Sequence, residues 1–323
     1  MSTSGEKSGC DTPITYSVVV PVYTNEETLA PLLAALLDVS RRLSGPMEAV
    51  FVSDGSPDGS LELLRQLLPT AGIPTQLLVH SRNFGSFAAI RTGLAAARGQ
   101  YVGVMAADLQ EPPELVEQFF AILRTGAADV CVGRRESRAD PMLTSILSRT
   151  FWWLYRRVIN PQIPRGGVDV FGCTAEVARR LLDLSESHSS LVGLLFWVGY
   201  RRVEVPYARR ERHAGRSGWT IRKRVRYLMD SVYSFTDVPI QVLSAVGVVG
   251  AGFTLIVGAL VFGFWAAGVI REPGYTPLML TMLFSTFVLL AGLGVVGSYV
   301  WRTYENSKGR PHAIAMTHTT YEG

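Results

Sequence analysis

Two long apolar stretches near the C-terminus constrain the fold of this chain more than any other feature. Residues 242–270 contain no charged side chain, and neither do residues 277–301. Each stretch exceeds the about 20 residues that an α-helix needs to cross the hydrocarbon core of a bilayer. Neither has a polar face, which argues against the alternative of two core helices in a soluble protein. Because only residues 271–276 separate them, the sequence predicts a two-helix transmembrane hairpin.

Basic side chains flank this apolar region on both sides. Eight arginines and lysines lie within residues 209–226, and three more follow at Arg302, Lys308 and Arg310. The positive-inside rule places both flanks in the cytoplasm. Residues 1–15 are polar and lack the continuous apolar core of a signal peptide. The chain is therefore expected to be a multi-pass protein of a bacterial inner (plasma) membrane, with both termini in the cytoplasm.

An amphipathic segment precedes the apolar stretches at residues 219–237. Its apolar side chains recur at spacings of three and four, as on one face of a helix: Ile221, Val225, Leu228, Val232 and Phe235. The other faces carry several bases, so the segment is predicted to lie as a helix in the membrane interface, where the bases contact anionic lipids. The alternative is a helix that packs back onto a soluble domain.

The first part of the chain has a different pattern, in which short apolar runs alternate with segments of helical spacing. The runs are residues 17–21, 49–53, 76–80 and 101–106, and the helical segments are residues 28–43, 60–68, 86–97 and 113–124. This alternation is typical of a mostly parallel α/β sheet covered by helices on both faces. In open sheets of that kind, ligands bind beyond the carboxyl ends of the strands.

The two patterns together predict the domain organisation. The whole chain is 48% hydrophobic and 18% charged, which suits a soluble domain joined to a membrane segment. The predicted parts are a polar tail (1–15), a cytoplasmic α/β domain (16–218), a juxtamembrane helix (219–237), the hairpin (238–302, with spans at about 242–270 and 277–301) and a cytoplasmic tail (303–323).

Cysteine and histidine chemistry is not indicated by the sequence. The three cysteines, Cys10, Cys131 and Cys173, are odd in number and show no CxxC spacing, which argues against a disulfide framework and a zinc cluster. The five histidines are scattered without a metal-binding spacing.

Carboxylates follow two of the predicted strands. Asp54 precedes a Gly-Ser turn, which alone is a weak signal, because Asp-Gly is common in turns. Asp108 and Gln110 are two residues apart, so they face the same side of an extended segment. Oxygen ligands at a strand end suit Mg²⁺ or Mn²⁺, which would bridge a diphosphate.

Seven motifs in order then give a resemblance to a known family. They are PVY (21–23), DGSPD (54–58), SRNFG (81–85), ADLQEPPE (107–114), GRRESR (133–138), GGVDVFGC (166–173) and RRERHAGRSGWT (209–220). Together they resemble glycosyltransferase family 2, which has the Rossmann-like GT-A fold. Within it, the chain resembles the polyprenyl-phosphate glycosyltransferases, such as bactoprenol glucosyltransferases and dolichol-phosphate mannose synthase. The similarity covers roughly residues 14–313.

The resemblance implies a role for each matching residue. Positions around the nucleotide sugar are matched by Pro21, Tyr23, Glu27, Asp54, Asp58, Arg82 and Asn83. The metal and diphosphate site is matched by Asp108 and Gln110. Asp169 matches an acidic position near the sugar, expected to act in positioning first and as a base second; with Asp108 it forms the expected catalytic pair. The lipid phosphate is matched by Arg135, Arg138, Arg212 and Ser217.

The implied reaction transfers a sugar from a nucleotide carrier, UDP rather than GDP, to undecaprenyl or decaprenyl phosphate with inversion. The product is a lipid-linked monosaccharide for cell-envelope glycosylation. The acceptor is already anionic, so it needs placement and charge relief, which arginines and Mg²⁺ or Mn²⁺ supply, more than deprotonation. Relatives also suggest a homo-oligomer, expected to be a tetramer.

Three positions depart from the family pattern. Ala106 stands where the first acid of Asp-x-Asp is usual, Ser53 where Asp-Asp-Gly-Ser has its first acid, and Thr24-Asn25 where Asn-Glu is usual. We therefore expect the metal to be held through Asp108, Gln110, the diphosphate and water.

Three other functions fit the sequence less well. A processive polysaccharide synthase would carry a Gln-x-x-Arg-Trp motif and more membrane helices, neither of which the sequence has. A non-catalytic nucleotide-sugar-binding scaffold would explain the lost carboxylates, but not the intact DLQ segment and full arginine set. Nucleic-acid binding is disfavoured, because the basic run abuts membrane segments.

Overall fold

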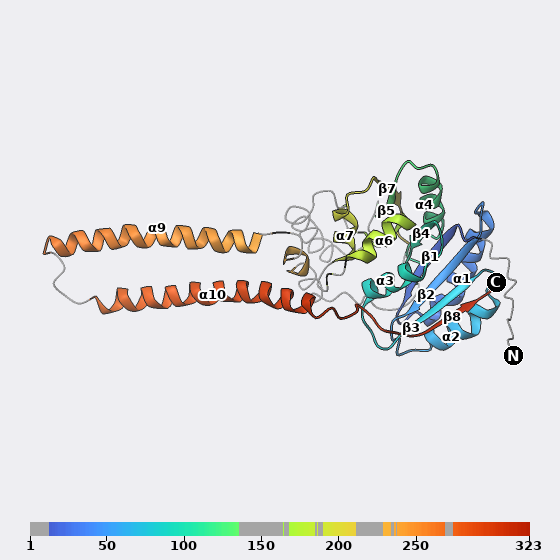
Figure 1. Cartoon of the computed structure of the whole chain (residues 1–323), viewed down its shortest axis with the longest axis horizontal. Coiled ribbons are helices and arrows are strands. Elements are labelled where there is room, and N and C mark those ends of the chain that lie inside the picture. The colour runs from blue at the N-terminus through green and yellow to red at the C-terminus, as the bar shows by residue number, and fades with distance from the viewer. Residues whose placement is uncertain are drawn as a thin grey trace, which may run out of the picture. The chain divides into compact units, whose positions relative to one another are not determined.

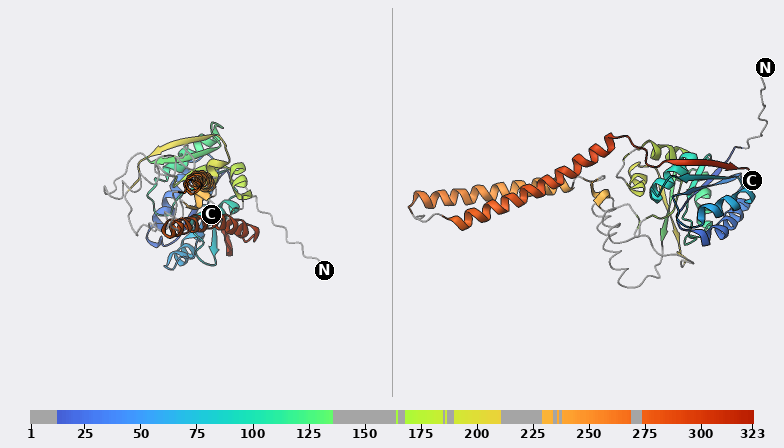
Figure 2. Two further views of the ribbon diagram at one scale, coloured as in Figure 1. Left: turned by 90° about the vertical axis from the view of Figure 1, so that its left-hand side faces the viewer. Right: turned by 90° about the horizontal axis from the view of Figure 1, so that it is seen from below.

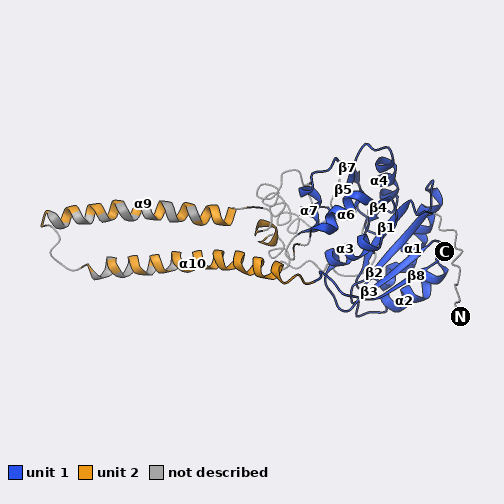
Figure 3. Cartoon of the chain, viewed as in Figure 1, with its two compact units in different colours: residues 1–185, 190–220, 311–323 blue, residues 186–189, 221–310 orange. Residues whose placement is uncertain are grey.

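The computed structural model describes residues 13–135, 164, 168–184, 186, 190–210, 229–233, 236, 238–268 and 274–323. These residues belong to two compact units (Figure 3). Unit 1 comprises Met1–Ser185, Ser190–Thr220 and Pro311–Gly323, and unit 2 comprises Glu186–Ser189 and Ile221–Arg310.

Unit 1 is built on one eight-stranded sheet, with strand order β7-β5-β6-β4-β1-β2-β3-β8 (Figure 1). The strands are β1 Tyr16–Val22, β2 Met47–Ser53, β3 Thr75–His80, β4 Tyr101–Val104, β5 Val130–Arg135, β6 Phe171–Thr174, β7 Arg202–Tyr207 and β8 Ala315–Tyr321. β4, β1, β2 and β3 are parallel, as are β5 and β7, whereas β6 and β8 run antiparallel to their neighbours. The expected α/β class with a mostly parallel sheet is confirmed.

Helices cover both faces of this sheet. They are α1 Glu26–Arg42, α2 Ser60–Leu67, the 3₁₀ turn η1 Leu68–Thr70, α3 Ser86–Ala96, α4 Glu114–Arg124, α6 Ala175–Asp183 and α7 Leu191–Trp197. α1, α2 and α4 share a core with alternate β1 residues such as Val18 and Val20. On the other face α3 approaches closely, because a Cβ at Gly93 would lie 2.3 Å from Val19 Cγ1. Successive strand residues point to opposite faces, so this alternation builds two cores from one strand.

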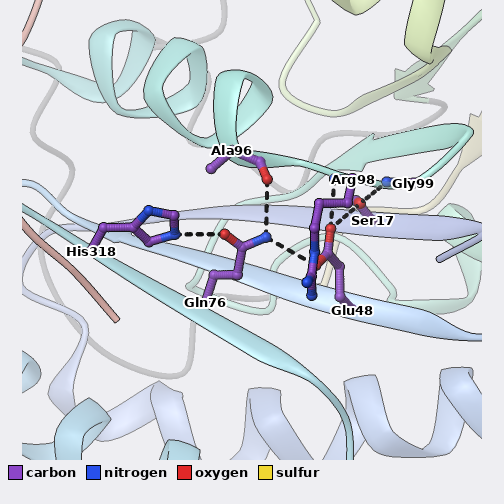
Figure 4. Close-up of polar contacts among 7 residues, drawn as sticks. All are labelled: Ser17, Glu48, Gln76, Ala96, Arg98, Gly99 and His318. Atoms are coloured by element: carbon purple, nitrogen blue, oxygen red, sulfur yellow. Dashed lines mark hydrogen bonds and ion pairs between the residues drawn. The ribbon is translucent and has the colours of Figure 1, made fainter. Parts of the chain in front are cut away.

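A buried polar network lies on the α3 face of the sheet (Figure 4). Glu48 is fully buried and accepts hydrogen bonds from Ser17 Oγ at 2.7 Å and from Gln76 Nε2 at 2.9 Å. The Arg98 backbone and guanidinium also donate to it, at 2.7 and 2.8 Å. Hydrogen bonds of this kind offset the free-energy cost of burying a charge. The network therefore joins β1, β2 and β3 to the loop after α3.

The final strand was not expected from the sequence, which assigned residues 303–323 to a tail. β8 instead pairs antiparallel with β3, and His318 Nε2 lies 2.7 Å from Gln76 Oε1 (Figure 4). The strand is exposed and polar, with the sequence AMTHTTY, so it lacks the apolar alternation that predicts strands. Its pairing depends on a partner about 240 residues away in the sequence, which no local pattern can reveal.

Unit 2 contains two long helices, α9 Val238–Ala266 and α10 Tyr275–Ser307, which run side by side (Figures 1 and 2). A Cβ at Gly292 of α10 would lie 3.2 Å from Leu243 of α9. Among the residues that the structure describes, one stretch, Phe284–Ser307, is long and apolar enough to cross a membrane, with mean hydropathy 1.7. Length and composition alone do not establish a membrane span, so the hairpin stays a prediction.

The predicted juxtamembrane helix is described only in part. Residues 229–233 are helical, and residues 219–228 lie outside the described part of the chain. Asp230 pairs with Arg302 of α10 at 2.7 Å, and the Arg302 guanidinium lies 4.8 Å from the centre of the Tyr233 ring. The Tyr233 ring also meets Tyr299 edge-on, with 5.2 Å between centroids. These contacts fix residues 229–233 against the end of α10 within unit 2.

Candidate active site

The topology of unit 1 brings the carboxyl ends of six strands to one edge of the sheet. β1, β2, β3 and β4 are parallel, and β5 has the same direction because both it and β4 run antiparallel to β6. β7 is parallel to β5. The loops after these strands, and the segment that enters β6, therefore converge at this edge. Every described residue of the predicted site lies in or beside one of them.

The loops after β1 and β2 cap the helices that follow them. Glu26 N at the start of α1 donates to Asp58 Oδ2 at 3.4 Å, and Gly59 N at the start of α2 donates to Glu26 Oε2 at 2.9 Å. Asp58 also accepts from Ser60 Oγ at 2.9 Å. Each carboxylate thus satisfies a free amide at a helix N-terminus, where negative charge is favourable. Asp58, predicted to bind the nucleotide, holds the two loops together here.

Asp54 is 2% exposed and its carboxylate faces the loop after β3. His80 Nδ1 and Phe84 N each lie 2.8 Å from Oδ1, and Gly85 N lies 2.8 Å from Oδ2. Burial raises the pKa of Asp54, but the bonds from His80, Phe84 and Gly85 outweigh it and hold the pKa below its ordinary value. Because a carboxylate only accepts, His80 Nδ1 carries the proton. Asp54 therefore fixes the Ser81–Gly85 segment.

Gly55 lets the Ser81–Gly85 segment come close to the loop after β2. It has a φ of +64°, and a Cβ there would lie 2.6 Å from the backbone of Arg82 and Asn83. Both features exclude a larger side chain. The predicted nucleotide residues Arg82 and Asn83 are exposed, and the Arg82 guanidinium lies 4.1 Å from the Phe84 ring centre. Their backbone is fixed while their side chains face solvent.

The other predicted nucleotide residues surround the end of β1. Tyr23 is 45% exposed, Glu27 is exposed, and Pro21 is half-buried within the strand. Thr24 between them has a φ of 55°, in the left-handed region that a β-branched residue rarely adopts. Backbone strain of this kind persists where surrounding contacts impose it, as Ser56 Oγ does here by accepting from Thr24 N at 3.2 Å.

The loop after β4 carries the predicted metal ligands. Leu109, between Asp108 and Gln110, also has a left-handed φ of 55°. Gln110 N donates to Asp108 Oδ1 at 3.3 Å, and Thr28 Oγ1 of α1 donates to the Ala107 carbonyl at 2.6 Å. The loop is therefore strained at its centre and held by α1.

The described residues near Asp108 offer few ligands to a divalent cation. Among the residues that the structure describes, no group of three or more His, Cys, Asp or Glu side chains is arranged to hold a metal. Asp108 is half-buried, and the Gln110 amide oxygen accepts from Arg209. Mg²⁺ commonly binds through one or two carboxylates plus substrate phosphates and water. The donor set fits a cation held by Asp108 together with a bound diphosphate, and not an all-protein site.

The structure shows the surroundings of two positions where the chain departs from the family pattern, Ser53 and Ala106. Ser53 is 1% exposed, and its hydroxyl has no hydrogen-bond partner among the described residues. The side chain faces the interior at the end of β2. An acid at this position would be buried, so its replacement by serine does not remove an exposed ligand. Ala106, in contrast, is half-buried beside the loop of Asp108.

Acids and arginines alternate beside the metal loop. Arg135 at the end of β5 forms an ion pair with Asp169, which enters β6. Arg209, just after β7, donates to Gln110 Oε1, and Arg210 N donates to the Gln110 carbonyl at 2.8 Å. The structure thus brings together the predicted diphosphate residues and Arg135 of the predicted lipid-phosphate set. Arg138, Arg212 and Ser217 lie outside the described residues.

Glu111 is a site residue that the sequence analysis missed. It is 2% exposed, and Arg209 Nε lies 3.5 Å from its Oε1. Burial raises the pKa of Glu111, the Asp108 charge adds to that effect, and Arg209 and Arg135 oppose it. The residue stands inside the ADLQEPPE motif, but a single acid before Pro-Pro carries no periodic signal of burial.

The described cysteines play no part in this site. Burial raises the pKa of Cys131 to about 12 and that of Cys173 to about 12. Both are free thiols and stay protonated at neutral pH, so neither is a nucleophile or a metal ligand.

Comparison with known proteins adds to this geometry. The profile described as "Glycosyl transferase family 2" matches residues 17–183. An uncharacterised glycosyltransferase of Synechocystis sp. is 31% identical over 92% of this chain and 93% of its own. The bactoprenol glucosyl transferase of Shigella phage SfV is 30% identical over 92% of this chain and 97% of its own.

Solved structures are more distant. The mannosyltransferase PcManGT from Pyrobaculum calidifontis, in complex with GDP-Man and Mn²⁺, is 17% identical over 91% of each chain, with a TM-score of 0.44. Similarity at that level carries no argument about this site.

Proposed function

This chain belongs to glycosyltransferase family 2 and is a glycosyltransferase, and on that premise we propose that it transfers a hexose from a UDP-sugar to a polyprenyl phosphate. One observation carries the proposal. The carboxylate of Asp108 and the guanidinium groups of Arg135 and Arg209 lie at one edge of the sheet, where Gln110 contacts Asp108 and Arg209, and Asp169 pairs with Arg135. A carboxylate supports a cation on the donor diphosphate, and arginines hold an anionic acceptor.

The chemistry needs one bond to form and one to break. An oxygen of the acceptor phosphate attacks the anomeric carbon, and the bond from that carbon to the nucleoside diphosphate breaks with inversion. The diphosphate leaves with the electron pair. Because the acceptor is already anionic, the main contribution of the protein is placement and charge relief.

Residues of the predicted site suit these tasks. Asp108 would hold Mg²⁺ or Mn²⁺, whose charge would offset that of the departing diphosphate. Arg135 would orient the acceptor phosphate, with Arg138, Arg212 and Ser217 as further phosphate-binding residues. Asp169, which pairs with Arg135, is proposed to position that guanidinium rather than to act as a base.

The nucleotide is proposed to lie over the loops that follow β1, β2 and β3. Tyr23, Glu27, Arg82 and Asn83 expose their side chains there. Asp54 and Asp58 are held by hydrogen bonds within the protein, so we propose that they shape this pocket and set the loop positions. Glucose is a candidate sugar, because the phage relative is named a bactoprenol glucosyl transferase.

The membrane part of the proposal rests on both long helices. α9 and α10 are proposed to form a transmembrane hairpin that keeps unit 1 in the cytoplasm, since bases flank both ends of the apolar region. Residues 219–237 are proposed to lie in the interface, which would bring Arg212 and Ser217 to headgroup level. A homo-tetramer is proposed from the family resemblance alone.

Membranes that contain the protein provide the test, with a panel of UDP- and GDP-sugars and undecaprenyl phosphate. We expect one UDP-hexose to yield a lipid-linked sugar, and excess chelator to abolish the product. Full turnover in chelator would contradict the metal site. Binding of a nucleotide sugar without a product from any donor would favour the non-catalytic scaffold, which the Ala106 departure motivates.

A further inference from the structure

Glu111 is the most deeply buried acid of the loop after β4. Its side chain is 2% exposed, whereas its neighbour Asp108 is half-buried. Neither carboxylate oxygen has a hydrogen-bond partner among the described residues. Such a group costs free energy unless a charge compensates it.

Two arginines from other strands supply that charge. The Nε atom of Arg209, after β7, is 3.5 Å from Glu111 Oε1, an ion-pair distance without a hydrogen bond. Arg135, at the end of β5, pairs with Asp169 and is close enough for its charge to lower the pKa of Glu111. The Nε atoms of both arginines are themselves buried without a hydrogen bond among the described residues. The Glu111 charge is therefore compensated by two arginines whose Nε atoms are buried.

The arginines in turn engage the residues that would handle substrate. Arg209 donates to Gln110 Oε1, and Arg135 donates to Asp169. The result is a row of alternating groups, Gln110, Arg209, Glu111, Arg135 and Asp169, drawn from β4, β5, β6 and β7 or the loops beside them. We call this the Glu111 row. Its centre, Glu111, is the least exposed of the five, which leaves almost none of its side chain for direct contact with a ligand.

We propose that Glu111 is a positioning residue, whose buried carboxylate holds the guanidinium groups of Arg135 and Arg209 at the places where they meet the phosphates of donor and acceptor. It acts through the arginines and touches neither substrate. A carboxylate so near an anion site opposes anion binding by Coulomb repulsion, so its contribution must lie in geometry. Removing the Glu111 charge should therefore worsen the placement of the two guanidinium groups. The affinity of the site for phosphate anions should stay the same or increase.

A double-mutant cycle on the full chain in detergent tests the pairing without any turnover. Arg209→Gln should lower the melting temperature by about 4 °C or more, because it leaves a buried carboxylate beside Asp108 with one cation fewer. Adding Glu111→Gln to that variant should recover part of the loss. Additive losses would overturn the pairing, since independent residues show no such coupling.

Turnover tests the positioning role, and this arm alone rests on the proposed function. Glu111→Gln should reduce kcat by about ten- to a hundredfold, because a misplacement near 1 Å can cost that much. Inorganic pyrophosphate should bind as tightly as to the wild type or tighter, and Glu111→Asp should restore part of kcat. The matched control is Glu114→Gln, which changes an exposed acid 3.5 Å from Arg210. Its kcat should stay within about twofold of the wild-type value.

The outcomes separate the two proposals. A Glu111→Gln enzyme with the kcat of Glu114→Gln overturns the positioning role, and so does a loss of pyrophosphate binding with kcat unchanged. A wild type that makes no product from any donor contradicts the proposed function, while the stability cycle still decides whether Glu111 holds Arg209.

Discussion

At the scale of single residues, the candidate site depends on carboxylates whose oxygens are engaged by the protein itself. Asp54 fixes the loop after β3, Asp58 caps α1, and Glu111 forms an ion pair with Arg209. The sequence motifs located the first two, because an acid after a strand followed by Gly is recognisable. They could not show that Asp54 faces inward, since burial depends on neighbouring loops that are distant in sequence.

Asp54 should make the stability of unit 1 depend on pH. Its folded-state pKa lies below the unfolded value, so its contribution is fully present above about pH 4 and is lost as the pH falls through the folded-state pKa. Asp54→Asn should cost about 1.5–3 kcal/mol at neutral pH, with a difference from wild type that shrinks in acid. Thermal unfolding at several pH values measures it, with exposed Asp38→Asn as the control. A difference that is constant with pH would refute the assignment.

Leu109 gives a test of backbone strain in the metal loop. At a left-handed φ of 55°, a Cβ costs about 1 kcal/mol, so Leu109→Gly should be more stable than Leu109→Ala by about that amount. The opposite order is expected at exposed Ala34 in α1, where Ala34→Gly should destabilise by about 1 kcal/mol. Denaturant unfolding compares the variants. If Leu109→Ala proves the more stable of the pair, the loop is not strained there.

At the scale of elements, the first four strands and the helices between them follow from pattern alone, because apolar runs and helical spacing alternate there. Strands β6, β7 and β8 do not follow from pattern in this way. β6 has only four residues, and β7 has an exposed glutamate and proline within it. β8 is polar and exposed, so its place on the sheet comes from pairing with β3 and from the contact of His318 with Gln76.

His318 should therefore stabilise the sheet measurably. Gln76 is 2% exposed, and His318→Ala would leave its amide oxygen without this partner at a cost of about 1–3 kcal/mol. Thr320→Ala, an exposed neighbour in the same strand, should stay within about 0.5 kcal/mol. Unfolding in denaturant distinguishes them. Equal effects of the two changes would mean that the contact contributes nothing specific.

At the scale of the whole molecule, we propose that a cytoplasmic α/β unit is joined to a membrane anchor of two helices. The family is established, and the α/β sheet is observed. The hairpin follows from two uncharged stretches and the bases around them, and length and composition mark one stretch of α10 among the described residues.

The hairpin predicts opposite exposure of two positions across the membrane. In a Cys10→Ser background, Pro273→Cys between the helices should react with an impermeant maleimide from outside intact cells. Thr320→Cys, near the C-terminus, should react only after the cells are opened. Equal labelling of both positions in intact cells would contradict the proposed topology.

The central claim is that the acceptor is a polyprenyl phosphate, and mass spectrometry of lipids from membranes tests it most directly. Membranes with the wild type, supplied with UDP-glucose and the other UDP-hexoses, should convert undecaprenyl phosphate to a species heavier by one hexose. Asp108→Asn should give none. A wild type that consumes a UDP-hexose while undecaprenyl and decaprenyl phosphates stay unmodified would contradict the account.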